Sequence, residues 1–80
     1  MTRWTVYTRP ECSLCEELLA DLAGLIGAGL PATDTVTVVD ISGDPELEQR
    51  YGQRVPVLMA DGEFVCAYRL DPERVRAFWS

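Results

Sequence analysis

Two apolar runs, residues 55–60 and 63–68, lie on either side of the dipeptide Asp61-Gly62. Asp-Gly between two such runs is the strongest short-range signal of a β-hairpin, because both residues tolerate the left-handed backbone of a tight turn. The second half of the chain therefore has to contain two neighbouring antiparallel strands. Pro56 opens the first of them, and a proline there removes one ladder hydrogen bond. On the residues alone, an edge strand that begins with a trans proline is the simpler interpretation.

The first half of the chain predicts a strand, a crossover helix and a second strand. Residues 4–8 alternate and are rich in β-branched and aromatic side chains. From residue 13, apolar residues recur at helical steps of three and four, until Gly27, Gly29 and Pro31 end the pattern. Residues 35–41 form a nearly continuous β-branched run, which is typical of a central strand buried on both faces. Two strands joined in this way pair in parallel with a right-handed crossover.

Two Asp-Pro pairs predict the starts of two further helices. Asp44-Pro45 and Asp71-Pro72 each place a capping carboxylate before a proline in the first helical turn. The first helix runs to residue 51 and stops at Gly52, and the last presents Val75, Phe78 and Trp79 to the core. The predicted order is β-α-β-α-β-β-α. This is an α/β fold with a four-stranded mixed sheet and three flanking helices, in one domain over residues 1–80.

The charge balance excludes several classes of function. Thirteen acidic residues face seven arginines, with no Lys or His, which gives a net charge of −6. Such a chain has no basic patch for nucleic acid or for an anionic membrane surface. The lack of His excludes Cys–His and Ser–His catalysis. No apolar run predicts a leader or a membrane span, so we expect a cytoplasmic protein.

Cys12 and Cys15 form a C-x-x-C pair at the predicted start of the first helix. The thiolate is the nucleophile of disulfide exchange, and a helix N-terminus stabilises it through free N–H groups and the dipole. We expect Cys12 to be exposed, near the N-cap, as the attacking sulfur. Cys15, one turn further and half-buried, would resolve the mixed disulfide. Nearby charges are mixed, because Arg9 favours the thiolate and three glutamates, Glu11, Glu16 and Glu17, oppose it.

Two structural explanations compete with this chemistry. A structural zinc site needs four ligands, and beyond the pair only Cys66 remains in a chain without His, so we predict no metal. Both cysteines could instead be inert core residues. Cys15 alone fits that interpretation, whereas Cys12 follows a Pro-Glu turn. Cys66 alternates with Phe64 and Tyr68 and is interpreted as a small apolar filler of the sheet.

The combination of motifs resembles the thioredoxin superfamily, and most of all the small bacterial glutaredoxin-like proteins. The resemblance covers essentially the whole chain. It is carried by residues 7–15 (Tyr-Thr-Arg-Pro-Glu-Cys-Ser-Leu-Cys), 39–41 (Val-Asp-Ile) and 51–58 (Tyr-Gly-Gln-Arg-Val-Pro-Val-Leu). The resemblance implies a three-layer thioredoxin-like fold and a cis Pro56 packed opposite Cys12. It also implies that the backbone of Val55 pairs with a cysteine-containing substrate.

For substrate binding, the resemblance implies glutathione, whose carboxylates meet basic side chains and a helix N-terminus. Arg9 and Arg54 are the matching positions, with Gln53 as a weaker one, and Asp71 matches the acidic residue before the last helix. Leu14 is expected at the lip of the site. This sequence has Ser13-Leu14 where glutaredoxins have Pro-Tyr, and residues 68–71 (Tyr-Arg-Leu-Asp) where they have a glycine-rich turn.

Together these features predict a monomeric dithiol oxidoreductase that acts on glutathione or protein disulfides through Cys12, Cys15 and Pro56. No tightly bound cofactor is expected, and glutathione is a possible co-substrate. The alternative is a binding module of the same fold. Such a module would be a sensor or a redox-inert domain that holds a protein partner, a metal or a cluster.

Overall fold

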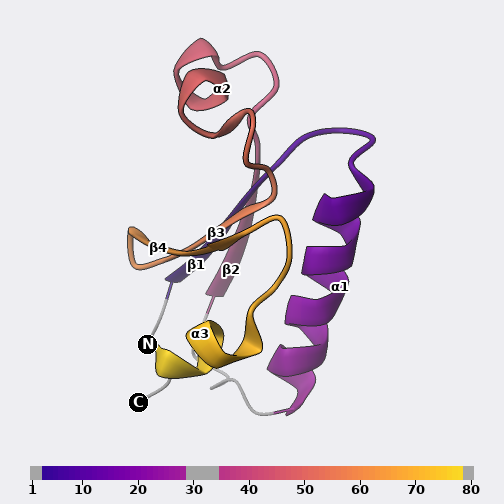
Figure 1. Cartoon of the computed structure of the whole chain (residues 1–80), viewed down its shortest axis with the longest axis vertical. Coiled ribbons are helices and arrows are strands. Elements are labelled where there is room, and N and C mark those ends of the chain that lie inside the picture. Colours follow the sequence, from indigo (N-terminus) through magenta and orange to yellow (C-terminus); the bar gives the residue numbers. More distant parts are fainter. Residues whose placement is uncertain (1–2, 29–34, 79–80) are drawn as a thin grey trace.

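The computed structural model describes residues 3–28 and 35–78, and its elements follow the predicted order (Figure 1). They are β1 (Arg3–Thr8), α1 (Ser13–Ala28), β2 (Thr35–Asp40), α2 (Pro45–Tyr51), β3 (Val57–Ala60), β4 (Glu63–Ala67) and α3 (Pro72–Ala77). The predictions that concern Gly29, Pro31 and Trp79 lie outside the described residues.

The four strands form one mixed sheet in the order β2-β1-β3-β4. β1 pairs with β2 in parallel and with β3 antiparallel, and β3 and β4 form the predicted hairpin. Asp61 and Gly62 both adopt left-handed backbone, with φ of 50° and 84°. This is the geometry that the Asp-Gly signal requires.

The predicted central position of residues 35–41 is wrong, because β2 is an edge strand of the sheet. Val38 is 52% exposed, whereas Trp4 and Val6 of the central strand β1 are fully buried. A β-branched run favours a strand but does not say which neighbours the strand will have. Among residues 36–41, Ile41, directly after β2, is fully buried, and Val36 packs against the core while partly exposed.

Alternation along β1 separates the two faces of the sheet. Trp4 and Val6 belong to a core that also contains Leu18 and Leu22 of α1 and Val75 of α3. The intervening residue Tyr7 points to the opposite face, where its ring stacks on Tyr51 of α2 at a centroid distance of 4.4 Å. The helices therefore flank the sheet on two sides, as a thioredoxin-like fold requires. In Figure 1, α2 lies beyond one end of the sheet, and it has no buried residue.

A register shift in β4 overturns the predicted grouping of its side chains. Leu58 pairs with Cys66 and Met59 with Phe64, so Val65 is an extra residue in β4. A bulge of this kind breaks the two-residue alternation. Cys66 is consequently 5% exposed while Phe64 is 51% exposed, so the two side chains do not share a face as the predicted alternation implied.

Both Asp-Pro helix starts are confirmed. The Asp44 side chain accepts hydrogen bonds from the backbone N–H groups of residues 46 and 47, and Asp71 does the same for residues 73 and 74, at 3.1–3.3 Å. In the part of the chain that is described, no helix has the length and apolar character needed to cross a membrane.

Candidate functional site

The β1–β3 register brings the two halves of the predicted site to one end of the sheet. Tyr7 near the end of β1 lies opposite Val57 at the start of β3. The chain that leaves β1 leads to Cys12, and the chain that enters β3 arrives through Pro56. The register therefore brings the ends of two segments more than 40 residues apart in the sequence to the same end of the sheet.

Cys12 and Cys15 are joined by a disulfide at the first turn of α1. The carbonyl of Cys12 accepts the first helical hydrogen bond, from Glu16 N–H at 3.1 Å, so Cys12 occupies the N-cap. Its Sγ accepts a hydrogen bond from the N–H of Cys15 at 3.2 Å. An N–H aimed at this sulfur would also stabilise a thiolate there.

The two sulfurs differ in accessibility. Cys12 is half-buried, whereas Cys15 is only 2% exposed and more deeply buried than predicted. An incoming disulfide can therefore reach Cys12 and not Cys15. This asymmetry matches the division into attacking and resolving thiols.

The residue before the pair has an unusual backbone. Glu11 adopts left-handed φ of 55°, which costs free energy in a residue with a side chain. The carboxylate is exposed and next in sequence to Cys12. Glu11 therefore forms the turn that leads into α1, with an exposed carboxylate one residue before Cys12.

The Val55-Pro56 peptide bond is cis, as the resemblance implied. Pro56 is buried, and its carbonyl accepts a hydrogen bond from Tyr68 N–H at 2.9 Å. Val55 is half-buried and precedes β3 instead of belonging to it. Among the described residues, none forms a hydrogen bond with the Val55 backbone. Buried backbone groups need partners, so this N–H and C=O can accept an added strand.

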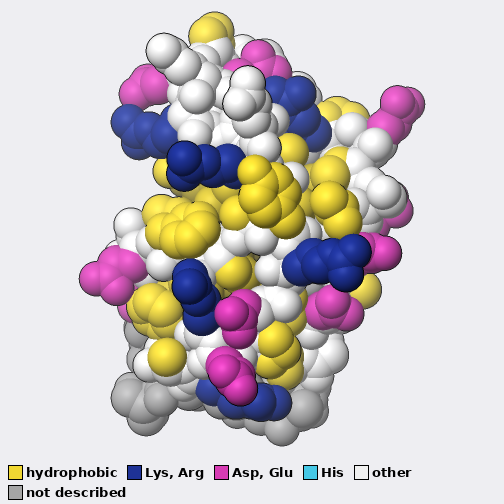
Figure 2. Space-filling model, viewed as in Figure 1, with side chains coloured by type: hydrophobic (Ala, Val, Ile, Leu, Met, Phe, Trp, Pro, Cys, Tyr) yellow, Lys and Arg dark blue, Asp and Glu magenta, His cyan; other side chains and the backbone are white. Residues whose placement is uncertain are grey.

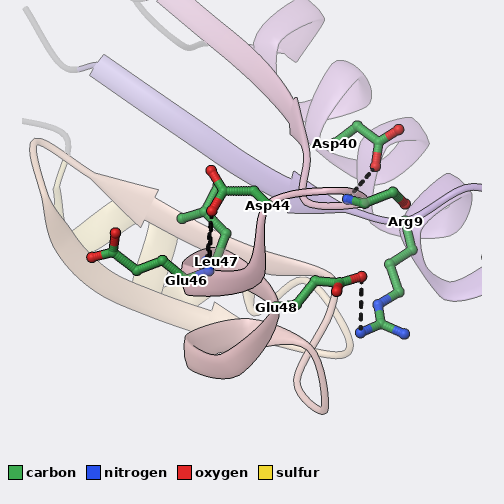
Figure 3. A network of polar contacts seen from close by, with 7 residues as sticks. Arg9, Asp40, Asp44, Glu46, Leu47 and Glu48 are labelled. Carbon is green, nitrogen blue, oxygen red and sulfur yellow. Dashed lines mark hydrogen bonds and ion pairs between the residues drawn. The ribbon is translucent and has the colours of Figure 1, made fainter.

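Arg9 is engaged with α2 (Figure 3). Its guanidinium lies 4.0 Å from the Glu48 carboxylate, with both side chains about two-fifths exposed. It also lies against Gly52, since a Cβ at that position would come within 2.6 Å of Arg9 Nη2 and would collide with the Glu48 carbonyl. Arg9 therefore ties the loop before Cys12 to the end of α2. Neither Glu48 nor this function of Gly52 was found from the sequence.

The other predicted binding residues are more scattered. Gln53 and Arg54 are exposed on the loop before Pro56, and Leu14 is half-buried instead of standing at an exposed lip. Asp71 caps α3 and lies 3.6 Å from Arg74 Nε, so its carboxylate already has protein partners. The structure brings Gln53, Arg54 and Val55 together on one loop and leaves Asp71 at a helix start.

Tyr68 is the residue of this region that the sequence analysis missed. It has left-handed φ of 70° and is 49% exposed. Its hydroxyl donates a hydrogen bond to the Gln53 carbonyl at 3.0 Å. The one available signal was its position in the turn where glutaredoxins have glycine, because glycine there marks left-handed backbone.

Cys66 lies outside the site. Burial raises the pKa of its thiol, which makes it a poor nucleophile at neutral pH. Within residues 3–28 and 35–78, no group of three or more Cys, Asp or Glu side chains is placed to hold a metal ion.

Comparison with known proteins agrees with this geometry. Residues 3–79 match the model of the glutaredoxin-like domain family (DUF836). The chain belongs to this family. Uncharacterised proteins of Mycobacterium tuberculosis and Mycobacterium bovis are each 34% identical to it over 75 residues, which cover 90% of this chain and 76% of each relative.

Two solved structures are similar to it. The solution structure of protein Ne2328 from Nitrosomonas europaea has a TM-score of 0.84 and 34% identity, covering 99% of this chain and 92% of that one. The X-ray structure of protein XcR50 from X. campestris has a TM-score of 0.71 and 35% identity, covering 94% and 92%. The chain is thus a thioredoxin-fold protein with a C-x-x-C pair at disulfide distance.

Proposed function

We propose that this glutaredoxin-like protein is a thiol–disulfide oxidoreductase. The carrying observation is the Cys12–Cys15 disulfide at the N-terminus of α1, with one accessible and one buried sulfur. The unpaired Val55 backbone beside the buried Pro56 supports a docking edge for a disulfide-containing chain. We propose that the protein works as a monomer in the bacterial cytoplasm, where reversible dithiol pairs are the usual form of cysteine redox chemistry.

The reaction follows from the two sulfurs. In the reduced protein, the Cys12 thiolate attacks the substrate disulfide, forms a mixed disulfide and releases one substrate thiolate. The Cys15 thiolate then attacks Cys12 Sγ, releases the second substrate thiolate and leaves the Cys12–Cys15 disulfide. Two electrons pass from the protein dithiol to the substrate disulfide. A thiol such as glutathione, or another dithiol, restores the reduced form. No bound cofactor takes part.

Trapping of the mixed disulfide tests this function. C15S should accumulate a covalent adduct at Cys12 when mixed with 2-hydroxyethyl disulfide, because the resolving step is lost. C12S should form none, and the matched variant C66A should turn over like the unchanged protein. Intact mass and peptide mapping measure the adduct. A C15S protein that stays unmodified under these conditions would refute the proposal and favour a binding module.

A redox titration provides the second measurement. The Cys12–Cys15 couple should equilibrate with glutathione between about −120 and −270 mV, the range of thioredoxin-fold proteins. A pair that cannot be reduced or oxidised within the cellular range would exclude turnover.

A further inference from the structure

Tyr68 makes two hydrogen bonds to the loop that carries the docking edge. Its N–H donates to the Pro56 carbonyl at 2.9 Å, and its hydroxyl donates to the Gln53 carbonyl at 3.0 Å. Val55 lies between these two acceptors in the sequence. The ring therefore lies along the loop beside the free Val55 backbone.

The ring is exposed although it is aromatic and doubly anchored. Tyr68 is 49% exposed, and it lines a depression between α1 and the turn before α3. Its lining also includes Leu18, one turn beyond Cys15, together with Ala20 and Leu70. In Figure 2, hydrophobic side chains gather across the middle of this face below α2, and arginines border them. An apolar side chain next to a reacting cysteine would bury surface here.

The charges at this depression do not suit an anion. Its rim carries the carboxylates of Glu17 and Asp21, against one guanidinium, that of Arg69. Two side chains that could bind glutathione already have partners in the protein. Arg9, which could meet a carboxylate, is paired with Glu48, and Asp71, which could meet the amine, caps α3. Glutathione carries two carboxylates, which the rim would repel.

We propose that Tyr68 determines substrate specificity, and that the substrate is the disulfide of an extended polypeptide with an apolar side chain beside its reactive cysteine. The polypeptide pairs with the Val55 backbone, and its apolar side chain packs on the Tyr68 ring. This inference rests on the proposed oxidoreductase function. It excludes glutathione disulfide as the preferred substrate while leaving a thiol free to act as reductant.

Two chromogenic probes test the preference. Each is a mixed disulfide with 2-nitro-5-thiobenzoate, one of glutathione and one of a capped peptide with Leu next to Cys. The reduced protein releases the coloured thiol from either probe through the two steps given above. The expected result is a kcat/KM about tenfold higher for the peptide, the scale of one well-packed side-chain contact. Equal or better use of the glutathione probe would overturn the inference.

Variants assign the preference to Tyr68. Y68G removes the ring and keeps the left-handed backbone, since glycine adopts positive φ freely. It should reduce the preference about tenfold, mainly through KM, whereas Y68F keeps the ring and should retain most of the preference. F64A is the matched control, because Phe64 is an equally exposed aromatic of β4 outside the depression. If Y68G does not fold, Y68N replaces it, since Asn also tolerates this backbone.

The outcomes separate the two proposals. Preference kept in Y68G, or lost equally in F64A, would show that Tyr68 does not set specificity. Failure of the unchanged protein to react with either probe or with 2-hydroxyethyl disulfide would instead defeat the oxidoreductase function itself.

Discussion

Asp71 offers a sharp test of whether its carboxylate serves the fold. It accepts hydrogen bonds from the backbone N–H groups of Glu73 and Arg74, at 3.1 and 3.3 Å, and lies 3.6 Å from Arg74 Nε. Replacing an N-cap Asp by Ala costs about 1 kcal/mol, and the partly exposed ion pair adds at most a few tenths. D71A should therefore destabilise the protein by roughly 1 kcal/mol.

The size of the chain converts this free energy into a temperature. Unfolding entropy near 60 °C is about 2.1 cal/mol/K per residue, or about 170 cal/mol/K for 80 residues, so D71A should lower the Tm by about 6 °C. D71N keeps the accepting oxygen and loses only charge, so its Tm should fall by at most about 3 °C. Thermal unfolding followed by circular dichroism measures both variants.

The pair D44A and D44N provides the matched comparison, because Asp44 caps α2 with the same geometry. An unchanged Tm in D71A would refute the capping argument. A D71N protein as unstable as D71A would show that the charge matters and the acceptor does not.

Three other perturbations test separate parts of the structure. G52A should destabilise the protein by about 2 kcal/mol, because the new methyl group would collide with the Glu48 carbonyl and the Arg9 side chain. Urea unfolding measures this change, and an unchanged midpoint would contradict it. Iodoacetamide at pH 8 should label Cys12 of the reduced protein at least tenfold faster than Cys66, since burial raises the pKa of the Cys66 thiol. Peptide mapping measures the two labelling rates, and similar rates would contradict this prediction. Burial and the neighbouring Tyr51 raise the pKa of Tyr7 above its ordinary value of 10.0. Tyr7 therefore loses its proton at lower pH in the unfolded state than in the folded state, and the free energy of unfolding falls as pH rises from about 10 through the folded-state pKa. Y7F should flatten that fall in urea titrations between pH 9 and 11.5, and an unchanged slope would count against the burial argument.

Local signals in the sequence predicted most of the fold because each has a local cause. Asp44 and Asp71 cap helices through N–H groups two and three residues away, and Asp61-Gly62 needs only its own backbone geometry. Strand order has no such local cause. Residues 35–41 looked central because they are β-branched, whereas the long-range pairing of β1 with β3 decided which strand is central.

The candidate site divides in the same way. The Cys12–Cys15 spacing and the helix start are local, and both were predicted. The resemblance, and not the residues alone, supplied the cis bond before Pro56. The Arg9–Glu48 pair and the Tyr68 hydroxyl bond join segments 39 and 15 residues apart, so their partners became visible only when the fold placed them together.

The alignment of Tyr7 with Val57 also shows that the candidate site draws on two separate parts of the chain. Cys12 belongs to a β1-α1-β2 half and Pro56 to an α2-β3-β4-α3 half, and the β1–β3 ladder is the seam between them. The candidate site, with Cys12 in one half and Pro56 in the other, therefore depends on an interface inside a single polypeptide. Val6 and Leu58 are buried residues that face each other along this seam. Under the proposed function, substituting either one should change activity by shifting the two halves relative to each other, although neither residue is next to a cysteine in the sequence. A chain divided between the two halves would keep Cys12 and Cys15 in the first fragment and would rejoin them to Pro56 only when the two fragments pair.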